Sequence, residues 1–401
     1  MNLKLHLSYS IMSAIIATLG SIVVAKLVGP HIYGELATFL AICAIISALA
    51  SGRIETALFS APESDLPQIL LTGILNSLLA CFLIAIFIEL LGVINTPFST
   101  YGSLRLIPIL SFFASSNQCL RSYDAKVSYS QNIEPIKLIS VVINYMTILM
   151  FSTLWSLTLV SLLRITTFSE LCVFSLYVLI NRKRLIHVIT IECMRSFVLT
   201  AKKYGSHMAH DIPSAALNIF GQQAQIIALS TFTTPEMAGY YTLAKKPFVA
   251  ISQFIMPPTT NHVRNIFLDS NEIAHDFSEY SKKLLILSAN LGLLAVISTF
   301  LLINFMPKSY APASVFIFPL LILSVFKNWI SPLTVYMYIR GKVKDNLNGQ
   351  LLYFFASIAP IALLIASRNS ISIYVYLSSI LLSLVYIYYY KLVKSYVIHT
   401  L

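Results

Sequence analysis

The sequence predicts an all-α polytopic membrane protein, with about twelve transmembrane helices arranged as two six-helix lobes. Two observations carry this prediction. Hydrophobic residues make up 57% of the 401 residues and charged residues only 11%. The apolar residues also gather in repeated continuous runs of spanning length, and not in the strict alternation that a transmembrane β-barrel requires.

A spanning helix needs about 20 mostly apolar residues. The first such run has only Lys4 ahead of it and no small-x-small cleavage site, so we expect it to be retained as a helix. The second, fourth, seventh and eighth runs are the least apolar. In order, the spans are expected at residues 7–28, 36–59, 68–91, 104–123, 135–155, 157–180, 208–231, 238–260, 282–306, 313–338, 347–367 and 371–390.

The 27 Lys and Arg residues are distributed very unevenly over the loops between these spans. If the N-terminus is cytoplasmic, eighteen of them lie on that side and only Arg105, Lys308 and Arg368 on the other. Because cytoplasmic loops carry the excess of Lys and Arg, we expect a multi-pass membrane protein with both termini in the cytoplasm. The net charge of +11 then reflects topology and contact with anionic lipids, and no nucleic-acid binding is expected.

A hydrophilic segment near the midpoint leaves six spans on each side. We therefore expect an N-terminal lobe over residues 1–180, a cytoplasmic linker over 181–206 and a C-terminal lobe over 207–401. The linker combines cations with apolar residues at broadly helical spacing, so it is either an interfacial helix on the inner leaflet or a simple basic connection.

Two similar turns support a pair of lobes. Pro30 and Gly34 follow the first span, while Pro235 and Gly239 follow the seventh, at a displacement of 205 residues. Both turns would lie on the outer side, so the lobes would be related by parallel and not inverted topology.

Charged residues inside or at the margins of the spans are the first candidate site residues. A charge near the bilayer centre costs roughly 2.5 to 3.5 kcal/mol on insertion scales, so such residues face a protein interior or a water-filled path. The six cations of this kind are Lys26, Arg53, Arg164, Lys245, Lys246 and Lys327. They predict an anionic cargo, and ion pairs between helices are the alternative interpretation.

The positions of these cations on their helices give two further expectations. Arg53 and Glu55 are two residues apart in the second span, so we expect them on different helix faces, unable to pair within the helix. Lys245 and Lys246 diverge by about 100° around the eighth span, so at least one is expected to reach the interior.

The seventh span carries an ordered polar face. Its members recur at helical spacing: Asp211, Ser214, Asn218, Gln222 and Gln225. A continuous polar face is unfavourable against lipid, so it is expected to contact other helices or an aqueous cleft, with Asn218, Gln222 and Gln225 as candidate ligands of a polar cargo.

Two carboxylates are candidates for binding a coupling ion. Asp211 lies next to His207 and His210, and Glu55 lies in the second span. For Asp211, an ordinary solvated helix start is the alternative. The five cysteines show neither metal-binding spacing nor a disulfide framework. We therefore expect no catalytic residue, no metal and no other cofactor.

Short motifs in both halves resemble a known family. They are Ala-Lys-Leu-Val-Gly-Pro at residues 25–30, Tyr33-Gly34, Gly-Arg-Ile-Glu-Thr-Ala-Leu at 52–58 and Gly-Tyr-Tyr-Thr-Leu-Ala-Lys-Lys-Pro at 239–247. This pattern resembles the Wzx-type O-antigen and polysaccharide-export flippases of the multidrug/oligosaccharidyl-lipid/polysaccharide exporter superfamily. Ile54 departs from that family, which usually has Tyr or a similar residue there.

The resemblance implies a transporter and not an enzyme, with twelve helices in two bundles around a central cavity. It implies alternating-access transfer of an undecaprenyl-diphosphate-linked oligosaccharide from the cytoplasmic to the periplasmic leaflet of the bacterial cytoplasmic (inner) membrane. Membrane lipids and other polysaccharide assembly proteins would be its further partners, and a sodium ion, a proton or the membrane potential would couple transport. Cations in a cleft would replace the hydration of the diphosphate. Arg53→Ala or Lys246→Ala is then predicted to stop surface polysaccharide assembly while the protein still accumulates in the membrane.

Two other functions share parts of this pattern. A cation-coupled multidrug exporter of the same superfamily would have the same fold, but it moves mostly cationic drugs, which a cavity lined by Lys and Arg disfavours. A membrane-embedded O-antigen polymerase is expected to place a sizeable catalytic loop on the outer side. The longest outer loop expected here covers only residues 92–103.

Overall fold

The structure is a computed structural model that describes residues 3–59, 61–95, 103–127, 133–182, 197–269, 273–339, 343–366 and 371–398. These residues form helices joined by short connections, and no strand occurs among them. Eight helical stretches are long and apolar enough to cross a membrane. The chain is therefore an all-α, multi-pass membrane protein, as the sequence predicts.

The predicted spans coincide with helices to within a few residues at most of their ends. Ile11–Ala50 holds most of the first and of the second predicted span, and Gly29, whose φ of 77° is not helical, lies between them. The fourth, seventh and eighth are helical but are not among the eight apolar stretches, because polar and charged residues lower their hydropathy. The α-helices are α1 (Leu3–Ala50), α2 (Leu66–Asn95), α4 (Leu106–Val127), α5 (Ile133–Leu154), α6 (Leu159–Ile180), α9 (Phe197–Lys203), α10 (Gly205–Phe232), α11 (Pro235–Asp269), α12 (Ile273–Phe305), α13 (Ile317–Ile330), α14 (Val335–Ile339), α15 (Val343–Ile358), α16 (Ile361–Ala366) and α17 (Ile371–Ile398). The 3-10 helices are η1 (Ile54–Phe59), η2 (Glu63–Asp65), η3 (Lys308–Phe316) and η4 (Ser331–Thr334).

The chain divides into two compact units. Unit 1 consists of Met1–Val28 and Thr38–Ile219, and unit 2 of Gly29–Ala37 and Phe220–Leu401. Both α1 and α10 are therefore shared between the units. The predicted boundaries of the lobes and linker remain a prediction, since residues 183–196 of the linker lie outside the described residues.

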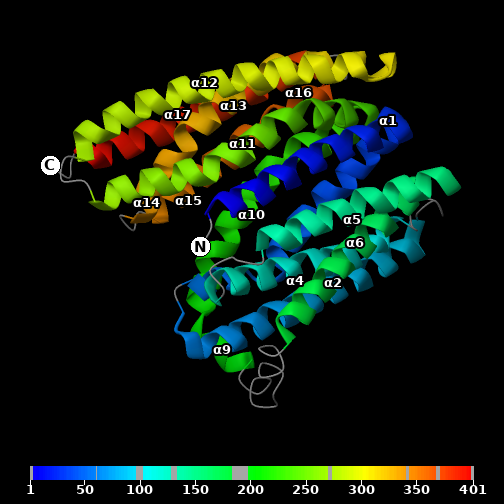
Figure 1. Ribbon diagram of the computed structural model, residues 1–401, viewed down its shortest axis with the longest axis horizontal. Helices are drawn as coiled ribbons and strands as arrows, with labels where there is room; N and C mark the ends of the chain where they lie inside the picture. The colour runs from blue at the N-terminus through cyan, green and yellow to red at the C-terminus, as the bar shows by residue number, and fades with distance from the viewer. Residues whose placement is uncertain are drawn as a thin grey trace. The chain divides into compact units, whose positions relative to one another are not determined.

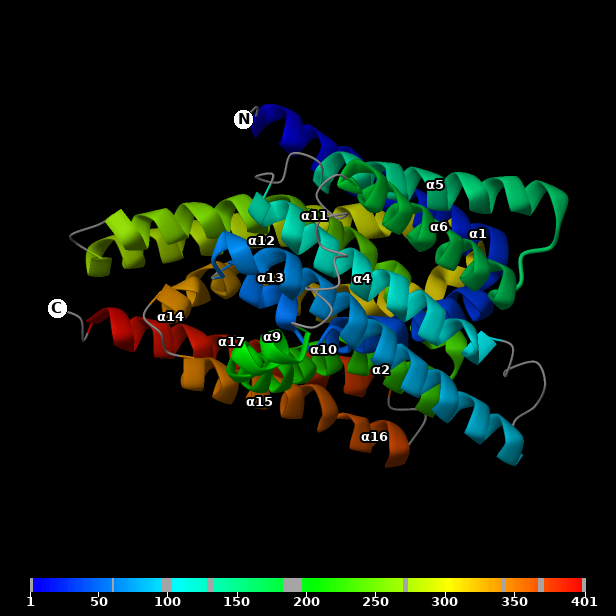
Figure 2. The same ribbon diagram turned by 90° about the horizontal axis from the view of Figure 1, so that it is seen from below.

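Each unit is a bundle of helices packed side by side. In unit 1, α4 packs between α2 and α6, and α6 also packs on α5 (Figure 2). In unit 2, α13 packs between α12 and α17 (Figure 1). Helix packing in a bilayer depends on close van der Waals contact and on hydrogen bonds between helices. The fully buried hydroxyls of Ser77 and Ser115, 2.8 Å apart, form such a bond between α2 and α4.

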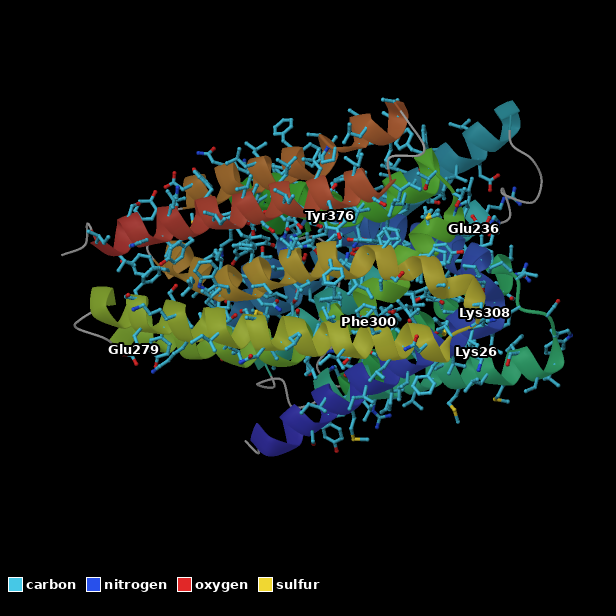
Figure 3. The ribbon with its side chains drawn as sticks, turned by 90° about the horizontal axis from the view of Figure 1, so that it is seen from above. Lys26, Glu236, Glu279, Phe300, Lys308 and Tyr376 are labelled. Atoms are coloured by element: carbon cyan, nitrogen blue, oxygen red, sulfur yellow. The ribbon has the colours of Figure 1, made fainter. Side chains whose placement is uncertain are left out.

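Large apolar side chains also cover outward faces of the helices. On α12, Leu293, Ile297 and Phe300 are exposed. Phe300 is labelled in Figure 3. Such faces are expected to contact lipid, because a bilayer is as apolar as the side chains themselves.

The described end of the predicted linker is anchored to unit 1. α9 packs against α2, and both Lys203 Nζ (2.5 Å) and Tyr204 Oη (2.7 Å) contact Asp65 Oδ2. Burial and the hydrogen bond to Asp65 raise the pKa of Tyr204 to about 12. The carboxylate of Asp65 thus holds α9 at the start of α2.

Replacing Asp65 by asparagine is expected to loosen α9, because the amide cannot form the ion pair with Lys203. Hydrogen–deuterium exchange of residues 197–203 should become about two- to fivefold faster, the range typical of an exposed ion pair. Glu63→Gln, at an exposed position of η2, should leave the exchange unchanged. Unaltered exchange in Asp65→Asn would mean that apolar packing alone holds α9.

Candidate functional site

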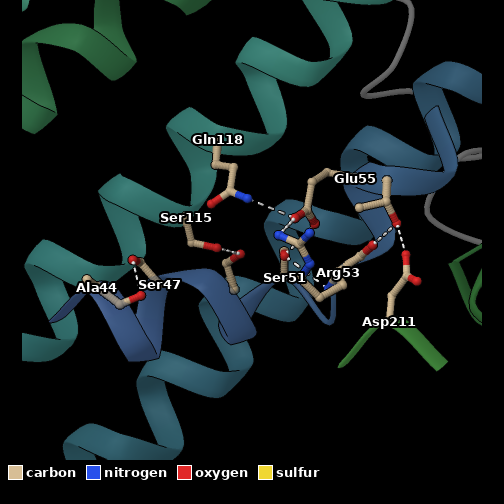
Figure 4. A network of polar contacts seen from close by, with 10 residues as sticks. Ala44, Ser47, Ser51, Arg53, Glu55, Ser115, Gln118 and Asp211 are labelled. Atoms are coloured by element: carbon tan, nitrogen blue, oxygen red, sulfur yellow. Dashed lines mark hydrogen bonds and ion pairs between the residues drawn. The ribbon is translucent and has the colours of Figure 1, made fainter. Parts of the chain in front are cut away.

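A network of polar side chains surrounds Glu55 in unit 1. The Glu55 side chain is 2% exposed. One of its carboxylate oxygens accepts from Ser51 Oγ at 2.6 Å, and the other accepts from Gln118 Nε2 at 3.0 Å and Arg53 Nη1 at 3.2 Å (Figure 4). The buried carboxylate is therefore both paired with a cation and hydrogen-bonded, as a stable buried charge requires.

The expectation that Arg53 and Glu55 cannot pair with each other is wrong. It assumed an α-helix as far as residue 59, whereas α1 ends at Ala50. Gly52 and Arg53 then adopt φ values of 67° and 58°, and η1 begins at Ile54. This turn brings the two side chains together. A positive φ is unfavourable for arginine, by roughly 1–2 kcal/mol, so the surrounding contacts must hold this backbone in place.

A hydroxyl connects this turn to α10. Thr56 Oγ1 lies 2.7 Å from the Arg53 carbonyl oxygen and 2.7 Å from Asp211 Oδ2. A hydroxyl has one proton, so it can donate to only one of these oxygens at a time. The side chains of His207 and His210 lie outside the described residues.

The second candidate site is a group of three lysines in unit 2, here called the lysine cluster: Lys245 and Lys246 on α11 and Lys327 on α13. Lys245 interacts electrostatically with both of the other lysines. Its Nζ lies 5.4 Å from the centre of the Tyr241 ring, within the range of a cation–π contact. Lys245 and Lys246 are half-buried, and Lys327 is exposed.

Polar side chains position the helices that carry the lysine cluster. Tyr241 Oη donates to Gln225 Oε1, which joins α11 to α10, and both residues are buried. Ser252 Oγ donates to Asn328 Oδ1 at 3.0 Å, which joins α11 to α13 beside Lys327. The lysines are thus presented by helices that hydrogen bonds hold together.

The two sites differ in charge balance. Arg53 has Glu55 as its partner, whereas no lysine of the cluster forms an ion pair or hydrogen bond with any residue that the structure describes. Cations gathered without anions repel one another. The lysine cluster is therefore a candidate site for an anionic group, and the Glu55 network is mainly a structural support.

The remaining predicted residues do not join either site. Lys26 and Arg164 are exposed, and neither pairs with an acidic residue among those described. Asn218 and Gln222 both make contacts, but Asn218 belongs to unit 1 and Gln222 to unit 2. The polar face of α10 is therefore divided between the units.

Sequence reasoning missed several members of these sites. Ser51 and Thr56 flank Arg53 and Glu55 but gave no signal of their own. Gln118 lies in the fourth predicted span, and its hydrogen bond to Glu55 joins two segments that are 63 residues apart in the sequence. Tyr241 lies in the motif at residues 239–247, but its contact with Lys245 follows from helical spacing of four residues.

Comparison with known proteins identifies the fold. No family model matches the chain, and no curated protein matches it. Among solved structures, the inward-facing conformation of a multidrug resistance MATE family transporter of the MOP superfamily matches 99% of this chain and 95% of its own, with a TM-score of 0.61 and 11% identity. A mutant of the Vibrio cholerae MATE transporter VcmN matches 98% of this chain and 96% of its own, with a TM-score of 0.60 and 11% identity.

An outward-facing conformation of a multidrug resistance MATE family transporter also matches, over 98% of this chain and 95% of its own, with a TM-score of 0.55 and 10% identity. The chain therefore has the twelve-helix, two-lobe fold of the MATE transporters over nearly its whole length.

Proposed function

We propose that this chain is a membrane transporter that exports an amphiphile with a negatively charged head group by alternating access. The observation that carries the proposal is the lysine cluster, three cations without an acidic partner among the described residues. The fold supports alternating access, because it resembles solved transporters in both inward-facing and outward-facing conformations.

The energetics of charge in a membrane favour an anionic substrate. Partly buried lysines lose hydration, which raises their free energy, and the repulsion between their charges raises it further. A phosphate or diphosphate would replace the lost hydration with charge-assisted hydrogen bonds and would relieve the repulsion. With a negative cell interior, outward movement of an anion is also favoured by about 2.3 kcal/mol per charge per 100 mV.

Among anionic amphiphiles, we propose an undecaprenyl-diphosphate-linked oligosaccharide, flipped from the inner to the outer leaflet of a bacterial cytoplasmic membrane. The motif at residues 239–247, which contains two of the lysines, supports this substrate by its resemblance to Wzx-type flippases. Gln222, which is half-buried on α10, would meet sugar hydroxyls, and the lipid tail would stay in the bilayer. Both termini would lie in the cytoplasm.

A multidrug exporter is the second candidate, and the comparisons favour it. Two of the solved transporters with this fold are described as multidrug resistance proteins. Against this candidate, the lysine cluster would repel the cationic drugs that such exporters mostly carry.

Proton binding at Asp211 is the coupling step that we propose. Asp211 is half-buried, and its Oδ2 contacts the hydroxyl of Thr56, next to Glu55, at 2.7 Å. Glu55 is the poorer candidate, because Arg53, Ser51 and Gln118 already occupy its oxygens. Protonation of Asp211 would therefore link transport to the proton gradient.

Deletion of the gene in its own bacterium tests the substrate. We expect lipid-linked repeat units to accumulate, measured by mass spectrometry of extracted lipids, while ethidium efflux stays unchanged. Restoring the wild-type gene should remove the accumulation. Unchanged lipid-linked intermediates together with slower ethidium efflux would identify a drug exporter instead.

The Asp211→Asn variant tests the coupling step. We expect this variant to export its substrate at a rate that no longer depends on the proton gradient.

A further inference from the structure

Aromatic side chains gather at the end of unit 2 where α17 ends beside the first turns of α12 (Figure 1). Tyr390 of α17 stacks on Phe277 of α12, with ring centres 5.9 Å apart, and contacts Trp329 of α13, with ring centres 5.0 Å apart. Trp329 Nε1 donates to Ser281 Oγ of α12 at 3.1 Å. Side chains of three helices thus meet at one aromatic junction.

The exposed apolar surface of α12 gives the depth of this junction in a bilayer. Large exposed apolar side chains of this helix run from Leu285 to Phe305. About 20 residues of α-helix span about 30 Å, which is the thickness of the hydrocarbon core. Phe277 and Ser281 precede this stretch, so the aromatic junction lies at the level of the lipid head groups. Trp and Tyr are enriched at that level, because their rings are apolar and their tips are polar.

Two exposed lysines of α17 border the aromatic junction. Lys394 follows Tyr390 by four residues, so both lie on the same face of the helix, and Lys391 precedes Lys394 by three residues. Neither lysine forms an ion pair or hydrogen bond with a residue that the structure describes. Trp329, Tyr390, Lys391 and Lys394 are here called the basic aromatic patch.

Two acidic side chains near the basic aromatic patch already have partners. Glu279, at the start of α12, pairs with Lys283 at 2.5 Å. Asp345 of α15 accepts a hydrogen bond from Tyr396, two residues beyond Lys394. The patch therefore keeps two positive charges that no carboxylate of the described residues compensates.

We propose that the basic aromatic patch binds the head group of an anionic phospholipid from the surrounding bilayer. The ammonium groups of Lys391 and Lys394 would contact the phosphate, and the rings would pack against the glycerol and the upper acyl chains. A soluble phosphate would gain only the charge contacts, whereas a lipid adds the apolar ones. The patch is separate from the lysine cluster, because Lys327 and Trp329 diverge by about 200° around α13. The inference does not depend on the proposed substrate.

Fluorescence quenching by brominated lipids tests this binding. The chain has two tryptophans, so Trp155→Phe leaves Trp329 as the only one. This full-length variant is placed in vesicles of equal parts phosphatidylglycerol and phosphatidylcholine, with one of the two lipids brominated on its acyl chains near the head group. We expect brominated phosphatidylglycerol to quench Trp329 more strongly. The relative affinity should favour it about fivefold or more, as one lysine near a membrane surface provides.

Substitution of the lysines tests their part in this preference. Lys391→Gln with Lys394→Gln should bring the relative affinity close to one, whereas Lys391→Arg with Lys394→Arg should keep the preference, since guanidinium also binds phosphate. Lys282→Gln with Lys283→Gln is the matched control, because it removes the same number of charges from the neighbouring α12. These two lysines diverge from Ser281 by about 100° and 200°, so the control should leave the preference unchanged.

Several results would overturn the proposal. Equal quenching by the two brominated lipids would mean that the patch has no preference for an anionic head group. No quenching by either lipid would mean that the patch does not face the bilayer. A preference that survives Lys391→Gln with Lys394→Gln, or that falls equally in the control, would come from the general positive charge of this end of the unit.

Two further measurements separate the patch from other sources of anion binding. Trp329→Phe leaves Trp155, which follows α5 in unit 1 and is 63% exposed. Quenching of Trp155 should be the same with and without Lys391 and Lys394, and a change would indicate a general effect of surface charge. Inorganic phosphate should lower the preference of Trp329 no more than sodium chloride of equal ionic strength does. A larger effect of phosphate would identify a site for the free anion and not for a lipid.

Discussion

Replacing Lys245 and Lys327 together by glutamine is expected to lower export at least about 100-fold while the protein remains folded. Each charge-assisted hydrogen bond contributes about 1.5–3 kcal/mol, which corresponds to about 10- to 100-fold per lysine. Both lysines lack an acidic partner among the described residues, so removal of their charges leaves no carboxylate unpaired. It also relieves their mutual repulsion.

The thermal stability of the double variant distinguishes lysines that bind the substrate from lysines that stabilise the fold. The double variant should unfold at the same temperature as the wild type or at a higher one, measured by thermal unfolding in detergent, while its export of the lipid-linked oligosaccharide is lost. Lys282→Gln, which removes an exposed lysine of α12, should change neither quantity. Export at the wild-type rate would refute the anion site, and loss of folding would assign the lysines a structural role.

The second large effect is expected from Arg53→Ala, and it concerns stability as much as transport. Glu55 is 2% exposed, and Arg53 is the only cation paired with it among the described residues. Breaking a buried ion pair by removing one partner typically costs about 3–5 kcal/mol. Because the Arg53 side chain keeps 23% exposure, we expect about 2–3 kcal/mol.

This expectation changes the outcome predicted from the sequence, in which Arg53→Ala accumulates normally. Accumulation in the membrane should fall, as measured by fluorescence-detected size-exclusion chromatography. Adding Glu55→Gln should restore much of it, because the amide keeps contacts with Ser51 and Gln118 and no charge remains unpaired. If Arg53→Ala is as stable as wild type but inactive, Arg53 binds substrate and is not mainly a structural partner.

The sequence predicts the helices well but the turns between them poorly. Hydropathy is a local property, so the twelve apolar runs locate the helices that cross the membrane. The predicted end of the second span is wrong. Residues 51–59 are more polar than the run before them, but polarity alone does not show that the α-helix stops at Ala50. Its turn depends on positive φ values at Gly52 and Arg53, which contacts from α4 and α10 support.

For the candidate sites too, the sequence identifies the residues but does not show which of them lie together. The lysines were identified from the sequence, because a charged residue in an apolar run is unfavourable in the bilayer unless it faces protein or water. Which of them lie together was not identifiable, since Lys327 is on a different helix from Lys245 and Lys246. The repeated turns at Pro30 and Pro235 were visible as a displacement of 205 residues, but their mutual contact was not.

The sequence by itself therefore determined that this is a helical multi-pass membrane protein with cations in its apolar runs, because lipid imposes its requirements residue by residue along each helix. Only the tertiary structure decided which charges are paired. It gave Arg53 a buried partner, left the lysine cluster without one among the described residues and placed Gly34 against the carbonyl of Pro235. These outcomes depend on contacts between distant segments, and the free energy of a charge is set by its neighbours in space.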